Sequence, residues 1–341
     1  MKLHIDTSAK DPIYKQIVQQ IERAVRERTL PPGQQIESMN ELASKEDISR
    51  ETVKKAYGIL VEKGIIIPKQ GKGFYAADIT SAGRTQVLVI FDKFSVYKQI
   101  TFNAFAERLS GKAEVTIVNH NQSLDLLEYY LDNYLDNFDY YVVTPHFPLD
   151  EASQERARKQ IARIPNRKLI MLDRLLPDYP GNYGSVYQDF ECDIYGGLCQ
   201  GFSVRPRADK LRVITLPSSL YGEYIRRGVE RFALEYHIPV EYLTSAPEDI
   251  RKGDTFLVLN SQLDAGLVDL ARKIQAASLV IGKDVQIISY NEYEMNELIL
   301  GGLTTVSTDF TQMGRLAADM ILNRHMEKIH CPFRMNLRKT F

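Results

Sequence analysis

Apolar residues recur at every fourth position from Ile13 to Val25, which places them on one face of a helix. The pattern predicts an amphipathic helix over about 11–28. Asp11 is suited to cap this helix, and Pro12 is suited to its first turn. The chain therefore begins with a helix that has one apolar face to bury.

Two further helices are predicted next. Ser38 and Glu41 have the spacing of a capping box, in which each side chain satisfies the other residue's free amide, so a helix is expected over about 39–45. Ser49 is suited to cap the following helix, which ends at Gly64. Only a tight turn separates the two helices, so they form a helix-turn-helix.

A β-hairpin is predicted over residues 65–75. Two β-prone runs flank a tip that contains Gly71, Lys72 and Gly73. Glycine lets backbone amides approach a phosphate or a groove edge closely, and the lysine adds positive charge. The hairpin is a wing beside the helix pair, so residues 1–77 are predicted to be a winged helix-turn-helix domain.

From residue 86 onward, apolar β-runs alternate with helical patterns, which predicts parallel sheets in an α/β fold. Small polar residues over 78–85 predict a linker before this region. Because residues 86–341 exceed one compact sheet and the alternation breaks near 200–210, we expect two lobes with a cleft between them. Strands are expected near 87–91, 115–118, 140–143, 168–172, 211–216, 255–259 and 285–289, and helices near 97–110, 123–136, 150–163, 221–236, 262–278 and 311–324.

Composition narrows the class of protein. The 341 residues are 44% hydrophobic and 26% charged, as in a globular chain with more than one core. No apolar run approaches the roughly 18 residues of a membrane span, and the first residues lack the apolar stretch of a signal peptide. We expect a cytoplasmic protein that does not enter membranes. Cys192, Cys199 and Cys331 are expected to be small buried hydrophobes.

Charge is distributed unevenly. Residues 1–77 contain 13 Lys and Arg against 10 Asp and Glu, whereas the rest of the chain contains 30 against 34. The small domain is thus mildly basic. In its second short helix, Arg50 and Lys54 lie one turn apart, away from the apolar stripe, and Thr52 lies near the helix start. Side chains so placed are suited to the major groove of DNA, and the positive end of the helix dipole favours phosphate.

Five segments of the small domain are diagnostic in their order and spacing: PIYKQI (12–17), LPPG (30–33), SMNELA (38–43), ISRETVKKA (48–56) and QGKG (70–73). Together they resemble the winged helix-turn-helix of the GntR family of bacterial regulators. Where that family often has an arginine, this chain has Asn40, which favours adenine over guanine at a base edge. The resemblance implies operator contacts from Ser49, Arg50, Thr52, Lys54, Gly71, Lys72 and Gly73.

The larger region carries a second set of segments: LDR (172–174), VYQD (186–189), LNS (259–261), SYNE (289–292), LTTVSTDFTQMGR (303–315) and Arg338. These resemble the periplasmic-binding-protein-like effector domain of LacI-type repressors, which some sugar regulators, including arabinose repressors, join to a GntR-type head. The resemblance spans residues 86–341. It implies that Asp173, Arg174, Asn260, Asn291 and Phe310 surround an effector.

The implied effector site has the chemistry of a sugar site. Carboxylate, guanidinium and amide groups pair with vicinal hydroxyls, and an aromatic face packs on the apolar side of a sugar ring. The family's arginine in the helix after 216 has no clean counterpart, and Arg226, displaced by one position, is the residue expected to contact the effector in its place. Phe94, Ser95 and Tyr97 follow the first α/β strand, and side chains at the carboxyl ends of strands line such clefts.

Enzyme motifs are absent from the sequence: no Gly-x-Ser-x-Gly elbow, phosphate-binding loop, His-Glu-x-x-His pair or dinucleotide fingerprint occurs. We expect neither catalysis nor a cofactor nor a metal, and His325, His330 and Cys331 are expected at the surface or in packing. A head fused to an aminotransferase-like body, a sugar-binding protein without gene control, and a DNA-binding architectural protein whose body only dimerises are the alternatives.

Taken together, these patterns predict a sugar-responsive transcriptional regulator. We expect a homodimeric repressor that leaves double-stranded operator DNA when a monosaccharide binds, with activation of transcription as the alternative. A pentose or a deoxyhexose, such as arabinose or fucose, is expected because the aromatic residues after the first α/β strand would crowd a larger ligand.

Overall fold

A computed structural model describes residues 3–6, 9, 11–27, 29–69, 72–77, 84–205, 208–215, 219–259 and 265–341. The chain divides into two compact units, Met1–Thr85 and Gln86–Phe341. Gly71, Asn260 and most of the expected linker lie outside the described residues. Among the residues described, no helix combines the length and apolar character needed to cross a membrane.

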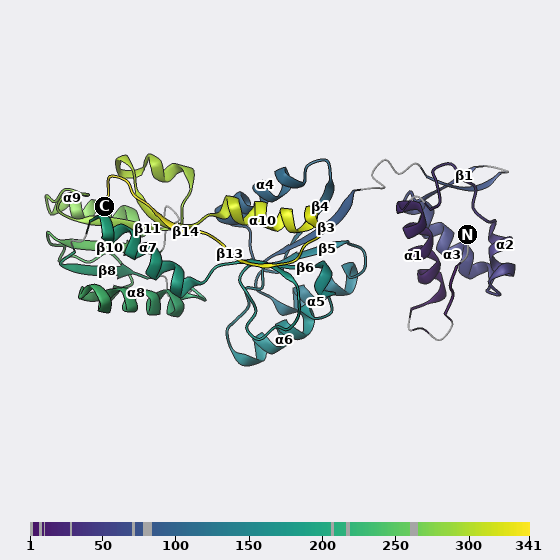
Figure 1. Ribbon diagram of the computed structural model, residues 1–341, viewed down its shortest axis with the longest axis horizontal. Coiled ribbons are helices and arrows are strands. Elements are labelled where there is room, and N and C mark those ends of the chain that lie inside the picture. The colour runs from purple at the N-terminus through teal and green to yellow at the C-terminus, as the bar shows by residue number, and fades with distance from the viewer. Residues whose placement is uncertain are drawn as a thin grey trace. The chain divides into compact units, whose positions relative to one another are not determined.

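The described part of the first unit contains helices and a two-stranded antiparallel hairpin (Figure 1). These elements confirm the predicted winged helix-turn-helix. The first helix begins later than predicted, because Pro12 holds the cap position and no side chain caps the helix. Asp11 instead accepts a hydrogen bond from Gln16 Nε2 through its main-chain oxygen at 2.8 Å. The elements are α1 (Ile13–Arg26), α2 (Met39–Lys45), α3 (Arg50–Glu62), β1 (Ile66–Lys69) and β2 (Gly73–Ala76).

An apolar core holds these elements together. Ile17 of α1 and Leu60 of α3 are both fully buried in it. Tyr57 of α3 adds two specific contacts: its hydroxyl donates to Glu37 O at 2.7 Å, and its ring meets the Phe74 ring edge-on at 5.0 Å. Tyr57 thereby fixes α3 against both the segment before α2 and the hairpin.

The second unit contains two lobes, each built on a six-stranded sheet flanked by helices (Figure 1). Its strands are β3 (Thr85–Phe91), β4 (Ala113–Asn119), β5 (Tyr140–Val143), β6 (Leu169–Asp173), β7 (Gly184–Tyr187), β8 (Lys210–Ile214), β9 (Val240–Leu243), β10 (Asp254–Val258), β11 (Gln286–Tyr290), β12 (Thr304–Thr308), β13 (Lys328–His330) and β14 (Phe333–Asn336). Its helices are α4 (Val96–Leu109), α5 (Leu124–Tyr134), α6 (Glu151–Ile161), α7 (Phe190–Val204), α8 (Gly222–Tyr236), α9 (Ala265–Ala276) and α10 (Phe310–Asn323), with 3-10 turns at Asn166–Lys168, Glu294–Glu297 and Ile299–Gly301.

The strand order is β13-β7-β6-β5-β3-β4 in the N-terminal lobe and β14-β12-β11-β10-β8-β9 in the C-terminal lobe. In the N-terminal lobe the adjacent strands β3, β5, β6 and β7 run parallel. In the C-terminal lobe the adjacent strands β8, β10, β11 and β12 also run parallel. The predicted two-lobed α/β architecture is confirmed. The sequence did not predict the antiparallel edge strand β14, which pairs with β12.

The described chain passes between the lobes at three crossings: residues 188–190 lead from β7 to α7, residues 308–310 from β12 to α10, and residues 331–332 from β13 to β14. As a result α10 follows a strand of the C-terminal lobe but packs on α4 of the N-terminal lobe, and Figure 1 shows the two helices side by side. The α7 helix makes the reverse exchange and packs on α8.

The cysteine prediction was partly wrong. All three cysteines are free thiols, but only Cys331 is buried; Cys199 is half-buried and Cys192 is exposed. Cys192 lies in the first turn of α7, where the helix leaves its crossing. In that turn Asp193 and Ile194 are the residues that are buried, so Cys192 is left on the side that faces solvent, which residue type alone does not reveal.

Candidate functional site

The caps predicted for α2 and α3 are present. Ser38 Oγ accepts a hydrogen bond from Glu41 N at 3.2 Å, and the Glu41 carboxylate accepts one from Ser38 N at 2.8 Å. Ser49 Oγ accepts from Thr52 N at 3.1 Å and lies 2.8 Å from Thr52 Oγ1. Ser49 and Thr52 therefore order the start of α3 before any DNA is bound.

Three polar residues of the helix pair extend into solvent. Arg50 is the first residue of α3, and Lys54, one turn later, lies 3.5 Å from Glu51 across an exposed ion pair. Asn40 is exposed in the first turn of α2. Two exposed cations one turn apart at the start of a helix whose opposite side is buried can reach base edges or phosphates.

The wing is fixed at its tip. Lys72 O accepts hydrogen bonds from Gln35 Nε2 at 2.8 Å and from Tyr75 Oη at 3.2 Å, while the Lys72 side chain is exposed. Gly73 has a φ of +94°, a conformation that favours glycine. Lys69 was not predicted, yet it is exposed on β1 with Nζ 4.3 Å from the centroid of the Tyr75 ring. The wing thus presents two exposed lysines, Lys72 and Lys69. Lys69 is recognised only from its exposure in the structure, which the sequence does not give.

A buried cluster of charged side chains lies at the carboxyl ends of the N-terminal lobe's strands. Asp92 follows β3, His146 follows β5, and Asp173 ends β6. Lys98, from the first turn of α4, donates a hydrogen bond to Asp173 Oδ2 and lies 3.4 Å from Asp92 Oδ1. His146 Nε2 lies 3.0 Å from Asp173 Oδ2. The cluster brings together two loops, the end of one strand and one helix around the Asp173 carboxylate.

The electrostatics of this cluster follow from burial and pairing. Burial alone would raise the pKa of Asp173, but Lys98 and His146 outweigh it and hold that pKa well below its usual range. The pKa of Asp92 is lowered in the same way, chiefly by Lys98. The carboxylates in turn outweigh the burial of Lys98, and its pKa is raised. Burial lowers the pKa of nearby His120 to about 4, so this ring is neutral at pH 7.

Arg174 and Tyr221 meet between the lobes. The guanidinium carbon of Arg174, just after β6, lies 5.2 Å from the centroid of the Tyr221 ring, just before α8. The same ring stacks on Phe190 at 4.4 Å and meets His146 edge-on at 5.1 Å. Asp173, Arg174 and Tyr221 are only 5%, 7% and 8% exposed. The expected cleft is therefore closed over these side chains.

Among the buried polar atoms that have no hydrogen-bond partner in the described residues are Arg174 Nη1, a donor, and Asn291 Oδ1, an acceptor. Asn291 follows β11 and has a φ of +72°, while Asp173 has a φ of +75°. Positive φ is uncommon outside glycine and is concentrated at functional sites. Asp173 and Asn291 thus share an uncommon backbone conformation at the ends of their strands, and a hydroxyl group, which both donates and accepts, could pair with the free atoms of Arg174 and Asn291.

The residues predicted after the first α/β strand divide into three roles. Tyr97 stacks on Phe310 at 5.2 Å, and both rings are buried between α4 and α10. Ser95 caps α4, with its Oγ accepting from Lys98 N at 3.3 Å. Phe94 is 54% exposed. Phe94 is the member of this set that remains open to solvent.

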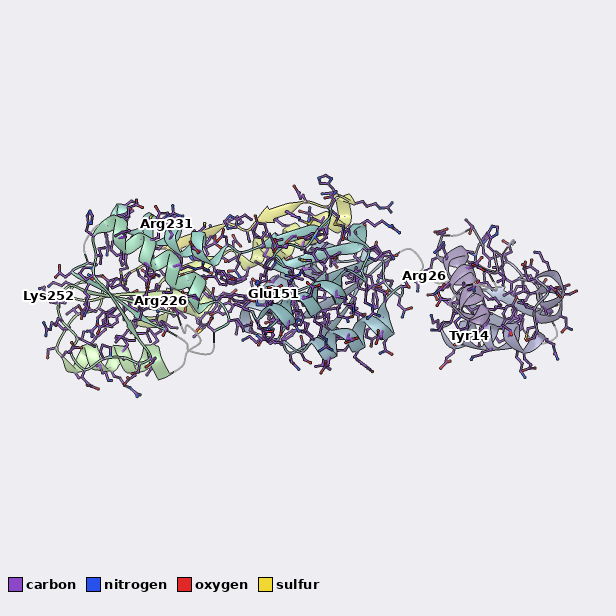
Figure 2. The ribbon with its side chains drawn as sticks, turned by 90° about the horizontal axis from the view of Figure 1, so that it is seen from below. Tyr14, Arg26, Glu151, Arg226, Arg231 and Lys252 are labelled. Carbon is purple, nitrogen blue, oxygen red and sulfur yellow. The ribbon has the colours of Figure 1, made fainter. Side chains whose placement is uncertain are left out.

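Arg226 is not brought to this cluster. It lies on the exposed side of α8, where Nε is 2.8 Å from Glu230 Oε1 and the guanidinium covers the Tyr242 ring at 4.7 Å (Figure 2). These surface contacts account for the side chain. The lysine and the ring that take part instead, Lys98 and Tyr221, were not predicted.

The cluster residues that were not predicted differ in whether the sequence could have revealed them. His146 follows the predicted strand over 140–143, so the rule that placed Phe94 in the site also applies to it. Lys98 lies in a predicted helix, where a lysine is ordinarily read as exposed. Only the fold reveals that Lys98 is buried against two carboxylates.

Known families match a segment in each of the two parts of the chain. Residues 13–76 match the bacterial regulatory proteins of the gntR family, and residues 212–336 match a periplasmic binding protein-like domain. The predicted resemblances of the two parts are thereby confirmed.

Curated relatives match parts of the chain. The HTH-type transcriptional repressor YtrA of Bacillus subtilis is 36% identical over 76 residues, which are 22% of this chain and 58% of the relative. The arabinose metabolism transcriptional repressor of Halalkalibacterium halodurans is 32% identical over 145 residues, which are 39% of this chain and 38% of the relative. The chain thus spans less than two thirds of the length of these relatives.

Solved structures share the fold at low sequence identity. A lac repressor described as bound to ONPG in the repressed state has a TM-score of 0.60 at 17% identity and covers 94% of this chain and 95% of its own. The trehalose repressor of Escherichia coli has a TM-score of 0.58 at 14% identity and covers 74% of this chain and 99% of its own. These likenesses concern the fold alone.

Proposed function

Because the chain joins a gntR-family regulatory domain to a periplasmic-binding-protein-like domain, we propose that it is a transcriptional repressor controlled by a small molecule. The observation that carries this proposal is the pairing of two features in one chain. One is an ordered helix-turn-helix with exposed cations; the other is a buried polar cluster between two lobes. A protein with both can bind DNA and can respond to a ligand.

Arg50, Lys54 and Lys72 are the proposed operator contacts. Arg50 suits base recognition, since its guanidinium can pair with guanine through two hydrogen bonds, and Lys72 suits a phosphate. Asn40, Ser49, Thr52, Gly71 and Gly73 complete the proposed surface. Ser49 and Thr52 also have a structural part there, because they cap α3.

The proposed effector is an uncharged monosaccharide bound between the lobes. With His146 neutral, Lys98 and Arg174 balance Asp92 and Asp173, so a phosphate or carboxylate would add an uncompensated charge to a buried site. The unpaired atoms of Arg174 and Asn291 suit hydroxyl groups. A pentose or a deoxyhexose is proposed, in keeping with the name of the arabinose metabolism repressor among the relatives.

The proposed assembly is a cytoplasmic homodimer. Two copies present two heads to the half-sites of a pseudo-palindromic operator, at a spacing that the bodies set. One structural relative is described as a lac repressor dimer bound to operator. Sedimentation of the full chain at micromolar concentration tests this part, and a single monomeric species there would contradict it.

The mechanism is a coupling between two binding sites. Ligand that favours one arrangement of the lobes changes the arrangement of the heads and lowers the affinity for the operator. Coupling is reciprocal, so operator DNA weakens ligand binding by the same factor. We expect typical coupling of about 1–3 kcal/mol, or roughly a 5- to 150-fold change in affinity.

The test begins with selection of preferred duplexes from a random DNA library by the full chain. Affinity for the selected duplex is then measured with L-arabinose, L-fucose, D-xylose, D-ribose and their phosphates. Arg50→Ala should weaken binding by about 1–3 kcal/mol. Lys63→Ala is the matched control, because this exposed lysine follows the far end of α3 and pairs with Glu22.

Three outcomes are decisive. Equal losses for the Arg50 and Lys63 variants would contradict the proposed reading helix. If no sugar changes the affinity for the selected duplex, the alternative of a DNA-binding architectural protein would be favoured. Tighter binding in the presence of a sugar would point to the opposite sign of control.

A further inference from the structure

Backbone hydrogen bonds tie the third crossing between the lobes to the other two. Cys331 N donates to Tyr187 O at 2.8 Å, which joins the third crossing to the end of β7 before the first. Asp309 N donates to Pro332 O at 2.9 Å, which joins the second crossing to the third. These bonds involve only main-chain groups, so they do not depend on residue type.

A side-chain bond joins the first crossing to the second. Thr308 Oγ1 donates to Gln188 Oε1 at 2.5 Å, and Gln188 Nε2 donates to Asp173 Oδ1. The orientation of the amide is fixed chemically: an ionised carboxylate can only accept, so the Gln188 nitrogen must face Asp173 and its oxygen is left for the threonine hydroxyl. Asp173 Oδ2 is bound in turn by Lys98.

These four residues form a continuous polar relay, running from Lys98 through Asp173 and Gln188 to Thr308. Each is less than a tenth exposed, with values of 7%, 5%, 9% and 2% in that order. Water is thus largely kept from replacing a broken bond, and the state of one member affects the next. The relay leads from the carboxylate at the candidate ligand site to two of the three crossings.

We propose that Gln188 and Thr308 are positioning residues that transmit the state of Asp173 to the angle between the lobes. The proposal rests on the function proposed above. A ligand hydroxyl that donates to Asp173 Oδ1 from the position that Gln188 Nε2 occupies displaces this amide from the carboxylate. When Gln188 turns away, its oxygen leaves Thr308, and the first and second crossings lose their direct side-chain link.

The loss has a mechanical consequence. The main-chain bonds of Cys331 and Asp309 remain, so the third crossing stays tied to the end of β7 and to the second crossing. The first and second crossings, however, are no longer joined directly. The lobes can then rotate about the third crossing. Ligand chemistry at Asp173 thereby becomes a change in lobe geometry without any contact between the ligand and a crossing.

The link itself is tested by amide hydrogen exchange on the full chain without DNA or sugar, read at Asp309 and Cys331. Thr308→Val and Gln188→Leu should each raise exchange there about tenfold, and the double variant should exchange no faster than the faster single variant. Thr308→Ser keeps the hydroxyl and should exchange at the wild-type rate. It also keeps the proposal testable if the leucine variant folds poorly.

Gln154→Leu is the matched control. Gln154 is also a buried glutamine of the N-terminal lobe, 5% exposed, but it bonds Pro148 O and not a crossing. Exchange at Asp309 and Cys331 should be unchanged in this variant. Additive effects of the Gln188 and Thr308 substitutions, fast exchange in Thr308→Ser, or an equal effect of Gln154→Leu would each overturn the relay.

Transmission is tested by adding L-arabinose to the wild type and to Thr308→Val. We expect the sugar to speed exchange at Asp309 in the wild type only, with its affinity for the variant within threefold. An equal response of the variant would overturn the proposal. If L-arabinose does not bind the wild type, that proposed effector fails, whereas the sugar-free exchange experiment still decides whether Gln188 links the crossings.

Discussion

The two lobes share one backbone plan and differ in chemistry. Across the two sheets β6 and β11 hold equivalent places, and so do β7 and β12. Asp173 at the end of β6 therefore corresponds to Asn291 after β11, and their φ angles are nearly equal, at +75° and +72°. The same unusual conformation carries a charged residue in one lobe and a neutral amide in the other.

The aromatic residues repeat the same plan. Tyr97 near the start of α4 stacks on Phe310, and Tyr221 before α8 stacks on Phe190. Both phenylalanines begin a helix directly after a crossing. The aromatic pairs are thus duplicated, whereas the buried lysine and its two carboxylates belong to the N-terminal lobe.

Under the proposed function, this difference assigns a separate task to each lobe. The charged cluster holds Asp173 rigid and ionised in the N-terminal lobe, as a fixed recognition group must be. In the C-terminal lobe, Tyr221 covers Arg174 with an aromatic face. Recognition is therefore expected to depend mainly on the first lobe, and closure on the second.

Substitutions at the equivalent positions Asp173 and Asn291 should show the largest difference in stability between the two lobes. Asp173→Ala leaves Lys98 buried with only the 3.4 Å contact to Asp92, and we expect it to lower the free energy of unfolding by about 3–5 kcal/mol. Asn291→Ala removes a neutral side chain and should cost about 1 kcal/mol, because alanine tolerates the positive φ less well than asparagine does. Urea unfolding of the full chain measures both, and equal costs would show that the charged cluster is not the stronger element.

The charged groups of the wild-type cluster should make the free energy of unfolding depend on pH in a defined direction. The lowered pKa values of Asp92 and Asp173 stabilise the fold above about pH 4, and this contribution is lost as pH falls through the folded pKa values. The raised pKa of Lys98 stabilises the fold below about pH 10 and is lost as pH rises further. The wild-type cluster therefore contributes fully between these limits.

Lys98→Met leaves two buried carboxylates without their cation, so their pKa values should rise. We expect a deficit of about 3 kcal/mol in unfolding free energy at pH 7 that shrinks toward pH 4, as the carboxylates become protonated. Urea titrations at pH 4, 5.5 and 7 measure this. A deficit that is constant over this range would mean that the lysine contributes packing and not charge.

Two glycines test whether the close packing of paired helices is equivalent in the two lobes. A Cβ on Gly314 of α10 would lie 2.1 Å from Thr101 O of α4, and a Cβ on Gly228 of α8 would lie 2.3 Å from Glu191 O of α7. Alanine at either position should cost about 2 kcal/mol, because backbone cannot move aside as a flexible side chain does. Thermal unfolding should give similar losses for the two variants, and a loss in only one lobe would refute the equivalence.

The smallest expected effect concerns closure. Tyr221→Leu removes the contact with Arg174 between the lobes and should cost about 1 kcal/mol. Tyr97→Leu removes stacking inside one lobe and should cost a similar amount. Small-angle scattering should show a larger radius of gyration for the Tyr221 variant alone, and expansion of both variants would contradict the assignment of closure to Tyr221.

Local signals in the sequence were most informative in the small domain. The Ser38 and Glu41 capping box and the Ser49 cap act over three residues, and the structure contains both. In the larger region the sequence did not predict α7, whose glycines are unfavourable in an isolated helix. A Cβ on Gly197 would lie 2.7 Å from the Phe333 ring, and one on Gly201 2.1 Å from Met335. Close packing on β14 therefore explains them.

Spacing along the chain determined what depends on neighbours: the caps, the helix faces, the alternation of strands and helices, and the place of Asp173 at the end of a strand. Tertiary structure alone decided which groups meet there. Lys98 is 75 residues from Asp173, and Thr308 is 120 residues from Gln188. Hydrogen bonds and ion pairs act over a few ångströms, so a sequence pattern cannot reveal partners that only the folding of two lobes brings into contact.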